Sequence, residues 1–379
     1  MLTALANART LADTGFVDDA VVLIDGSRIV AVVAPSDPRV LTAHIHDLSG
    51  CMLAPGFIDC QVNGGGGVLF NDAPSVDGIR RIATAHRRFG TTGLLPTLIS
   101  DNAGAMRTAI DAVREAIRLQ VPGVLGIHLE GPFLAPQRQG IHDASKFRAP
   151  TDDDIDLIAA RDAGRILITV APEKVAPQTL RALAARGVIL AAGHSAATYA
   201  QTRAALAAGV RGFTHLYNAM SPLGSREPGV VGAALEDSAS WCGIIADGHH
   251  VHAAALRIAL AAKPRGKVFL VTDAMPPVGS DSNHFTLNGE SITCRDGKCT
   301  NSDGVLAGSA LDMASAVRNT VALLGVPAEE ALRMASQYPA AFLGMEQNRG
   351  RIAPGYVADL VALDENLSVR HTWIGGARD

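Results

Sequence analysis

The chain has 379 residues, of which 48% are hydrophobic and 18% charged, and its formal net charge is −4. This composition can supply a large apolar core, and the lack of a basic surplus argues against a nucleic-acid-binding protein. No apolar run reaches the roughly 18 residues of a membrane span, and the chain does not begin with a basic segment followed by an apolar one. We therefore expect a soluble protein with no signal peptide and no membrane partner.

The two ends of the chain are patterned as short strands. Near the start, AVVLIDGSRIVAVVAP places two apolar runs around Asp25-Gly26-Ser27, which is typical of a hairpin. Near the end, a Pro-Gly pair precedes another candidate strand at 358–363. We predict that residues 1–54 and 348–379 together form one small β-sandwich domain.

The middle of the chain, residues 55–347, alternates apolar strands with amphipathic helices. The candidate strands are 55–63, 92–98, 124–131, 166–172, 188–194, 211–216, 241–248 and 268–274. Eight such alternations predict an α/β fold in which a parallel sheet closes as a (β/α)8 TIM-like barrel. After the eighth strand we expect an irregular stretch at 281–303 with a possible hairpin, then helices at 309–325 and 327–343.

Polar residues gather at the carboxyl ends of these strands, the rim at which such barrels carry their active sites. In the first strand, period-two alternation puts Asp59, Gln61 and Asn63 on one face. The other strand-end residues are His128, Glu130, His194, His215, Asp247, His249, His250 and Asp273. One such residue alone is more often a core hydrogen-bonding group, but their recurrence at the ends of five strands after the first favours a functional site.

Glu130, His194 and His215 offer one carboxylate and two imidazoles from three strands, the ligand set of a catalytic metal with an open fourth position. A metal held in this way acidifies water and polarises a carbonyl, and Asp273 on a neighbouring strand is a candidate general base. We predict one divalent ion, zinc in the first place, with iron, cobalt or manganese as alternatives.

Three further features have plainer interpretations. The pair His44 and His46 precedes the barrel, so we interpret it as a solvated strand face. Glycines 64–67 lack the helix start and acidic partner of a dinucleotide site, and we expect them to let substrate approach the backbone. The five cysteines, Cys51, Cys60, Cys242, Cys294 and Cys299, lie mostly in apolar runs, which favours reduced thiols and a cytoplasmic location over a disulfide framework.

Over nearly its whole length the chain resembles the N-acetylglucosamine-6-phosphate deacetylases of the amidohydrolase superfamily. The resemblance rests on PGFIDCQVNGGGG, HLEGPFL, GIHDASKF, GHSAATYAQ, THLYNAMSPLGSREPGVVGAAL, IIADGHHV, LVTDAMPPVG, GVLAGSALDM and GRIAPGYVADLVALD. Many amidohydrolases carry H-x-H at the end of the first strand, whereas one branch of these deacetylases has Q-x-N and works with a single metal. Gln61 and Asn63 match that branch, so we expect their amides to hydrogen-bond water or substrate.

The resemblance also implies roles for individual residues. The family's active-site aspartate falls on Asp273, and His142 matches a histidine near the acyl carbonyl, where a donor would stabilise an oxyanion. Arg226 and His250 match the groups that bind the 6-phosphate, although a solvated loop charge and a strand cap are their plainer readings. The full predicted substrate-contacting set is Gln61, Asn63, Ile141, His142, Asn218, Ala219, Arg226, Asp247, His250, Leu306, Ala307 and Gly308.

The predicted reaction is hydrolysis of the acetamide of N-acetyl-D-glucosamine 6-phosphate to glucosamine 6-phosphate and acetate. An amidohydrolase that deacylates a different amino sugar or an N-acyl amino acid is the alternative, and a metal-free scaffold protein is the rival from another class. In the family part of the phosphate grip crosses a subunit interface, which implies a homodimer or homotetramer.

Overall fold

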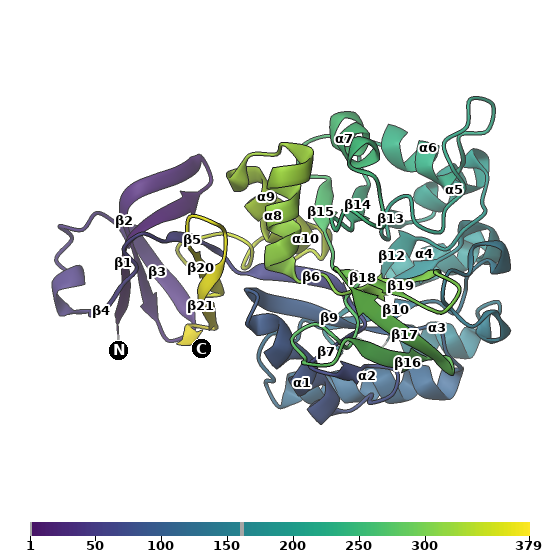
Figure 1. Ribbon diagram of the computed structural model, residues 1–379, viewed down its shortest axis with the longest axis horizontal. Helices are drawn as coiled ribbons and strands as arrows, with labels where there is room; N and C mark the ends of the chain where they lie inside the picture. The colour runs from purple at the N-terminus through teal and green to yellow at the C-terminus, as the bar shows by residue number, and fades with distance from the viewer. Residues whose placement is uncertain (1, 160–162) are drawn as a thin grey trace.

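The computed structural model describes residues 2–159 and 163–379, which form a β body beside a larger α/β body (Figure 1). Both chain ends lie in the β body, whose sheet runs in the order β22-β21-β20-β5-β1-β2-β3, with β4 paired to β1. Its strands are β1 Thr3–Ala12, β2 Gly15–Asp25, β3 Arg28–Val33, β4 His44–Asp47, β5 Met52–Pro55, β20 Leu360–Leu363, β21 Val369–Ile374 and β22 Ala377–Arg378. This sheet draws on both termini, as predicted, and β2 and β3 form the hairpin expected around Gly26.

The α/β body is the predicted barrel. In the described part of the chain, eight strands pair in parallel in the order β15-β14-β13-β12-β11-β10-β9-β6. They are β6 Phe57–Val62, β9 Thr91–Ile99, β10 Gly126–Glu130, β11 Arg165–Val170, β12 Ile189–Ala192, β13 Val210–Phe213, β14 Trp241–Ile244 and β15 Val268–Leu270. The ring closes at the rim, where the Asp273 N–H donates to the Gln61 carbonyl at 3.0 Å and Val62 bridges Ala274.

Helices follow the strands around the outside of the barrel. They are α1 Val76–Arg87, α2 Ala103–Arg118, α3 Asp152–Ile158, α4 Pro177–Ala185, α5 Tyr199–Ala207, α6 Gly229–Glu236, α7 Ala253–Ala262, α8 Met313–Leu324, α9 Ala328–Ala335 and α10 Gln337–Phe342. The sequence marks several starts with caps: Ser75, Asn102 and Asp312 each accept a backbone N–H three residues on. The helix predicted at 327–343 is divided at Ser336 into α9 and α10, a difference from the expectation.

An antiparallel sheet, which we call the lid, is inserted between β15 and α8. Its strands are β16 His284–Leu287, β17 Glu290–Arg295, β18 Lys298–Thr300 and β19 Leu306–Ser309, so the predicted hairpin is confirmed and extended. A disulfide joins Cys294 to Cys299 across β17 and β18. The expectation of reduced thiols is therefore wrong for this pair, because strand pairing brings together two cysteines that the sequence merely places five residues apart, while Cys51, Cys60 and Cys242 are free.

Two other expectations can be compared with the fold. His44 and His46 lie on β4, in the β body, away from the barrel rim. The glycine run forms the short pair β7 Gly64–Gly65 and β8 Val68–Leu69, and it does not line the central cavity. A Cβ on Gly65 would lie 2.8 Å from His86 Nε2, so these glycines permit close packing against α1 rather than substrate approach. None of the helices in residues 2–159 and 163–379 has the length and apolar character to span a membrane.

Candidate metal centre and active site

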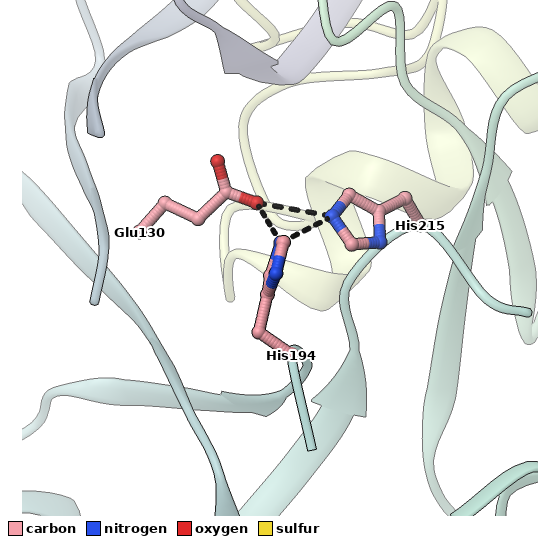
Figure 2. Close-up of side chains that lie close together, drawn as sticks. All are labelled: Glu130, His194 and His215. Carbon is pink, nitrogen blue, oxygen red and sulfur yellow. Dashed lines mark hydrogen bonds and ion pairs between the residues drawn. The ribbon is translucent and has the colours of Figure 1, made fainter. Parts of the chain in front are cut away.

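Glu130, His194 and His215 converge at the carboxyl-terminal rim of the barrel (Figure 2). Glu130 Oε1 lies 3.0 Å from His215 Nε2 and 3.3 Å from His194 Nε2, and the two Nε2 atoms are 3.1 Å apart. Three donors on a tetrahedral zinc, each about 2.0–2.1 Å from the ion, would be separated by about 3.3 Å. The spacing therefore fits three corners of a tetrahedral cation site.

The hydrogen bonds around the triad favour metal-ligating forms of its side chains. His194 Nδ1 lies 2.9 Å from the Arg138 carbonyl, to which it can only donate, so the neutral ring presents an unprotonated Nε2 to the site. Burial by itself raises the pKa of Glu130, but the adjacent imidazoles of His194, His215 and His142 outweigh it and hold that pKa well below its usual range. The carboxylate is thus charged and ready to bind a cation.

Asp273 lies beside the triad, in contact with the amides of the first strand. Asn63 Nδ2 donates to Asp273 Oδ1 at 2.6 Å, and Gln61 Nε2 donates both to that oxygen at 3.1 Å and to Glu130 Oε1 at 2.9 Å. Burial and the nearby charge of Glu130 raise the pKa of Asp273 to about 6. The two amides therefore orient the carboxylates, whereas the sequence pointed to hydrogen bonds with water or substrate. Asn63 Oδ1 is left without a partner among the described residues.

His142 reaches the same cavity from the segment that follows β10. Its ring is buried, and burial lowers the pKa of His142 to about 3, so the imidazole is neutral. Ser100 contacts Nδ1 through its hydroxyl at 2.8 Å and its backbone N–H at 3.4 Å. A ring that accepts the Ser100 N–H at Nδ1 carries its own proton on Nε2, which lies 3.7 Å from Glu130 Oε2. His142 can therefore donate a hydrogen bond beside the triad.

Backbone strain marks the same residues. His194, His215 and Asp273 have φ values of +48°, +31° and +54°, in the left-handed region that side chains with a Cβ rarely adopt. Each such residue costs on the order of 1–3 kcal/mol, which the surrounding structure must offset. Asp273 shows how: its N–H donates to Gln61 of β6, and its carbonyl accepts from Ser309 of β19.

The triad forms the floor of a cavity of about 430 Å³, within the range of small-molecule sites. Of the predicted substrate contacts, the cavity lining includes Asn63, Ile141, His142, Asn218, Ala219, His250, Leu306 and Gly308. It does not include four others. Gln61 lies behind Asp273, Ala307 packs in the lid core, Asp247 Oδ2 holds His250 Nδ1 at 2.6 Å, and Arg226 is exposed on the loop before α6.

Sequence reasoning missed other residues of this site. Ser100 directly follows β9, so the strand-end rule that selected the triad would have found it. Lys298 and Val305 line the cavity from the lid. His249, which the sequence placed at a strand end without a specific role, lines it from the loop after β14. Lys298 and Val305 gave no signal of their own in the sequence, because they reach the rim through an insertion whose placement strand alternation does not predict.

Comparison with known proteins identifies the family to which the chain belongs. The model of the amidohydrolase family matches residues 52–378. The chain belongs to the amidohydrolase family. It is 46% identical to an N-acetylgalactosamine-6-phosphate deacetylase of Shewanella sp. (strain ANA-3) over 88% of this chain and 84% of the relative. It is 34% identical to the N-acetylglucosamine-6-phosphate deacetylase of Haemophilus influenzae, over 99% of each chain.

Solved structures agree with the family assignment. The crystal structure of N-acetylglucosamine-6-phosphate deacetylase from Pasteurella multocida superposes with a TM-score of 0.96 at 34% identity, covering all of both chains. This amidohydrolase chain therefore shares the whole fold of that deacetylase, including the barrel and the β body.

Proposed function

We propose that the protein hydrolyses the acetamide of N-acetyl-D-glucosamine 6-phosphate, releasing acetate and glucosamine 6-phosphate. The observation that carries the proposal is the convergence of Glu130, His194 and His215, with Asp273 alongside, on the floor of a cavity of about 430 Å³. The family and the printed activities of the relatives at 34% and 46% identity support the same chemistry.

The metal is a divalent cation held by the triad, and we propose zinc because two imidazoles and a carboxylate suit this borderline ion. Such a cation would supply Lewis acidity, polarising an acyl carbonyl and lowering the pKa of water toward about 7. Gln61 and Asn63 both donate to carboxylates, so the amides at the end of the first strand support one cation site rather than a second.

The chain's own residues divide the remaining work. Asp273 accepts a proton from the attacking water and passes it to the nitrogen as the C–N bond breaks, so the amine leaves neutral. The two amide donors fix the carboxylate on which this transfer depends. His142 donates from Nε2 to the carbonyl oxygen while negative charge develops there. Asn218 and Ala219 line the cavity beside His215 and would position the sugar.

N-acetyl-D-galactosamine 6-phosphate, the C4 epimer, is a second candidate substrate. It is favoured by one observation, the 46% identity to an N-acetylgalactosamine-6-phosphate deacetylase, against 34% to the glucosamine enzyme of Haemophilus influenzae. Both epimers present the same acetamide and the same phosphate, so the proposed roles of the triad, Asp273 and His142 apply to either.

The test is acetate release from both phosphorylated epimers, both unphosphorylated sugars and an N-acetyl amino acid, with the same metal-loaded protein. We expect the highest kcat/KM with a phosphorylated sugar, and the ratio between the epimers decides the principal substrate. Release only from the N-acetyl amino acid would contradict the proposal.

Assembly and location complete the proposal. We propose a homodimer or homotetramer in which Arg226, exposed on its own chain, reaches the phosphate in a neighbouring subunit. A cytoplasmic location stays a prediction: the free thiols of Cys60 and Cys242 agree with it, whereas the Cys294–Cys299 disulfide is unusual in a reducing compartment.

A further inference from the structure

The cavity has two chemically different ends. Its floor holds the triad and Asp273, and its outer end is formed by His249, His250 and the lid residues Lys298, Gly304, Val305 and Leu306. Among the described residues that line it, Lys298 is the one with a permanent positive charge; the other basic groups are histidines. A sugar phosphate bound with its acetamide at the floor has its dianionic phosphate at a distance from the triad. The charge of the outer end therefore determines how well the phosphate is bound.

The backbone around Lys298 is held in place although its side chain is exposed. Lys298 begins β18 and pairs with Arg295 of β17, across a turn at Asp296 and Gly297. The neighbouring register pair is the Cys294–Cys299 disulfide, and the Asp296 carbonyl lies 3.0 Å from His249 Nε2. The disulfide thus crosslinks the two strands of the hairpin, and the His249 contact joins the hairpin to the loop after β14.

The side chains at this end are available to an anion. No side-chain hydrogen bond or ion pair joins Lys298 to another residue in the described ranges. His250 Nδ1 is engaged by Asp247 Oδ2 at 2.6 Å, which leaves Nε2 to face the cavity that this residue lines. The acids Glu130 and Asp273 are confined to the floor, so no carboxylate among the described lining residues competes for Lys298.

We propose that Lys298 contacts the substrate's phosphate from within its own chain and determines the preference for phosphorylated over unphosphorylated sugars. The inference rests on the proposed function and assigns a residue to it that the sequence motifs did not indicate. A lysine ammonium binds phosphate as a point charge and needs no bidentate geometry, so a flexible side chain on the edge of the lid is adequate. The neighbouring lid residue Arg295 does not line this cavity.

The test compares Lys298→Met with two controls. Arg295→Met removes the same charge from the paired position of the same hairpin, and Lys298→Arg keeps the charge. For Lys298→Met we expect the ratio of kcat/KM values, phosphorylated over unphosphorylated sugar, to fall about 10- to 100-fold, mainly through KM, as expected for loss of a charge-assisted contact. Arg295→Met should stay within about threefold of the parent because an exposed, screened charge contributes little. Lys298→Arg should recover most of the preference.

An activity-independent measurement separates this inference from the proposed function. Inorganic phosphate should raise the melting temperature of the metal-loaded parent and of Arg295→Met, and raise that of Lys298→Met clearly less. An unchanged substrate ratio in Lys298→Met, or an equal phosphate response in parent and Lys298→Met, would overturn the role of Lys298. A parent that binds phosphate through Lys298 yet deacetylates neither phosphorylated sugar would instead contradict the proposed function.

Discussion

The floor and the outer end of the cavity are built in opposite ways. At the floor, Glu130, His194, His215 and Asp273 are buried, in contact with neighbouring polar side chains, and lie at or just after the ends of barrel strands. At the outer end, Lys298 is exposed, without a side-chain partner in the described ranges, and carried by an inserted sheet. The difference fits the proposed roles, in which the barrel positions the catalytic groups and the lid and loops select the substrate.

The floor also contains residues in strained backbone conformations. His194, His215 and Asp273 all have positive φ, and neighbouring strands hold Asp273 through its N–H and carbonyl groups. Donors and acceptors that are already in position need little reorganisation during the reaction. Such preorganised groups are the usual means by which enzymes stabilise the charge that develops in the transition state. The outer end needs affinity and discrimination, which tolerate a mobile side chain. Substitutions at the two ends should therefore change different kinetic parameters.

The largest effect should come from Asp273→Asn at the floor. The amide cannot accept a proton from water, so we expect kcat to fall by roughly 10²- to 10⁴-fold with little change in KM. The bound metal should persist, since Asp273 is outside the triad. Steady-state kinetics with metal analysis of the same sample checks both expectations.

Asp101→Asn is the matched control for Asp273→Asn. Asp101 lies just after β9 on the same side of the barrel and pairs with Lys146 at 3.6 Å, outside the cavity lining. Its substitution removes the same charge and should leave kcat within about threefold. If Asp273→Asn retained more than a tenth of the parent's kcat, Asp273 would not be the base.

A smaller effect should come from Asp59, beneath the floor. Its Oδ2 accepts the Thr272 hydroxyl at 2.5 Å, and burial, partly offset by hydrogen bonds with Thr272 and Gln61, raises the pKa of Asp59 to about 7. The folded state therefore keeps this proton while the unfolded chain releases it near pH 4. The free energy of unfolding therefore decreases as the pH rises through this range to about 7. The total decrease is on the order of 4 kcal/mol.

Asp59→Asn should remove that loss. Urea unfolding at equal metal loading should show the parent losing on the order of 3 kcal/mol more than the variant between pH 5 and pH 8. Asp77→Asn, at an exposed acid of α1, is the control and should track the parent. Parallel pH profiles for the parent and Asp59→Asn would show that Asp59 does not carry this linkage.

The same division explains what the sequence could predict. The barrel strands are apolar runs at regular spacing, and Glu130, His194 and His215 stand at or just after their ends, so fold and metal site followed from the pattern. The lid lies outside the alternation. The pairing that brings Cys294 to Cys299, and Lys298 to the cavity, depends on tertiary placement that no local periodicity encodes. The resemblance predicted Asp247 as a substrate contact, and local periodicity did not indicate that its carboxylate contacts His250.

The central claim is that three side chains distant in sequence hold one cation on which amide cleavage depends. The most direct measurement is a titration of metal-stripped protein with Zn²⁺, following bound metal per chain and acetate release from N-acetyl-D-glucosamine 6-phosphate and its C4 epimer. We predict that activity rises linearly and saturates at one ion per chain, and that the triple variant Glu130→Gln, His194→Gln, His215→Gln neither retains the ion nor releases acetate. Full activity in stripped protein, or a tightly bound ion in the triple variant, would contradict the account.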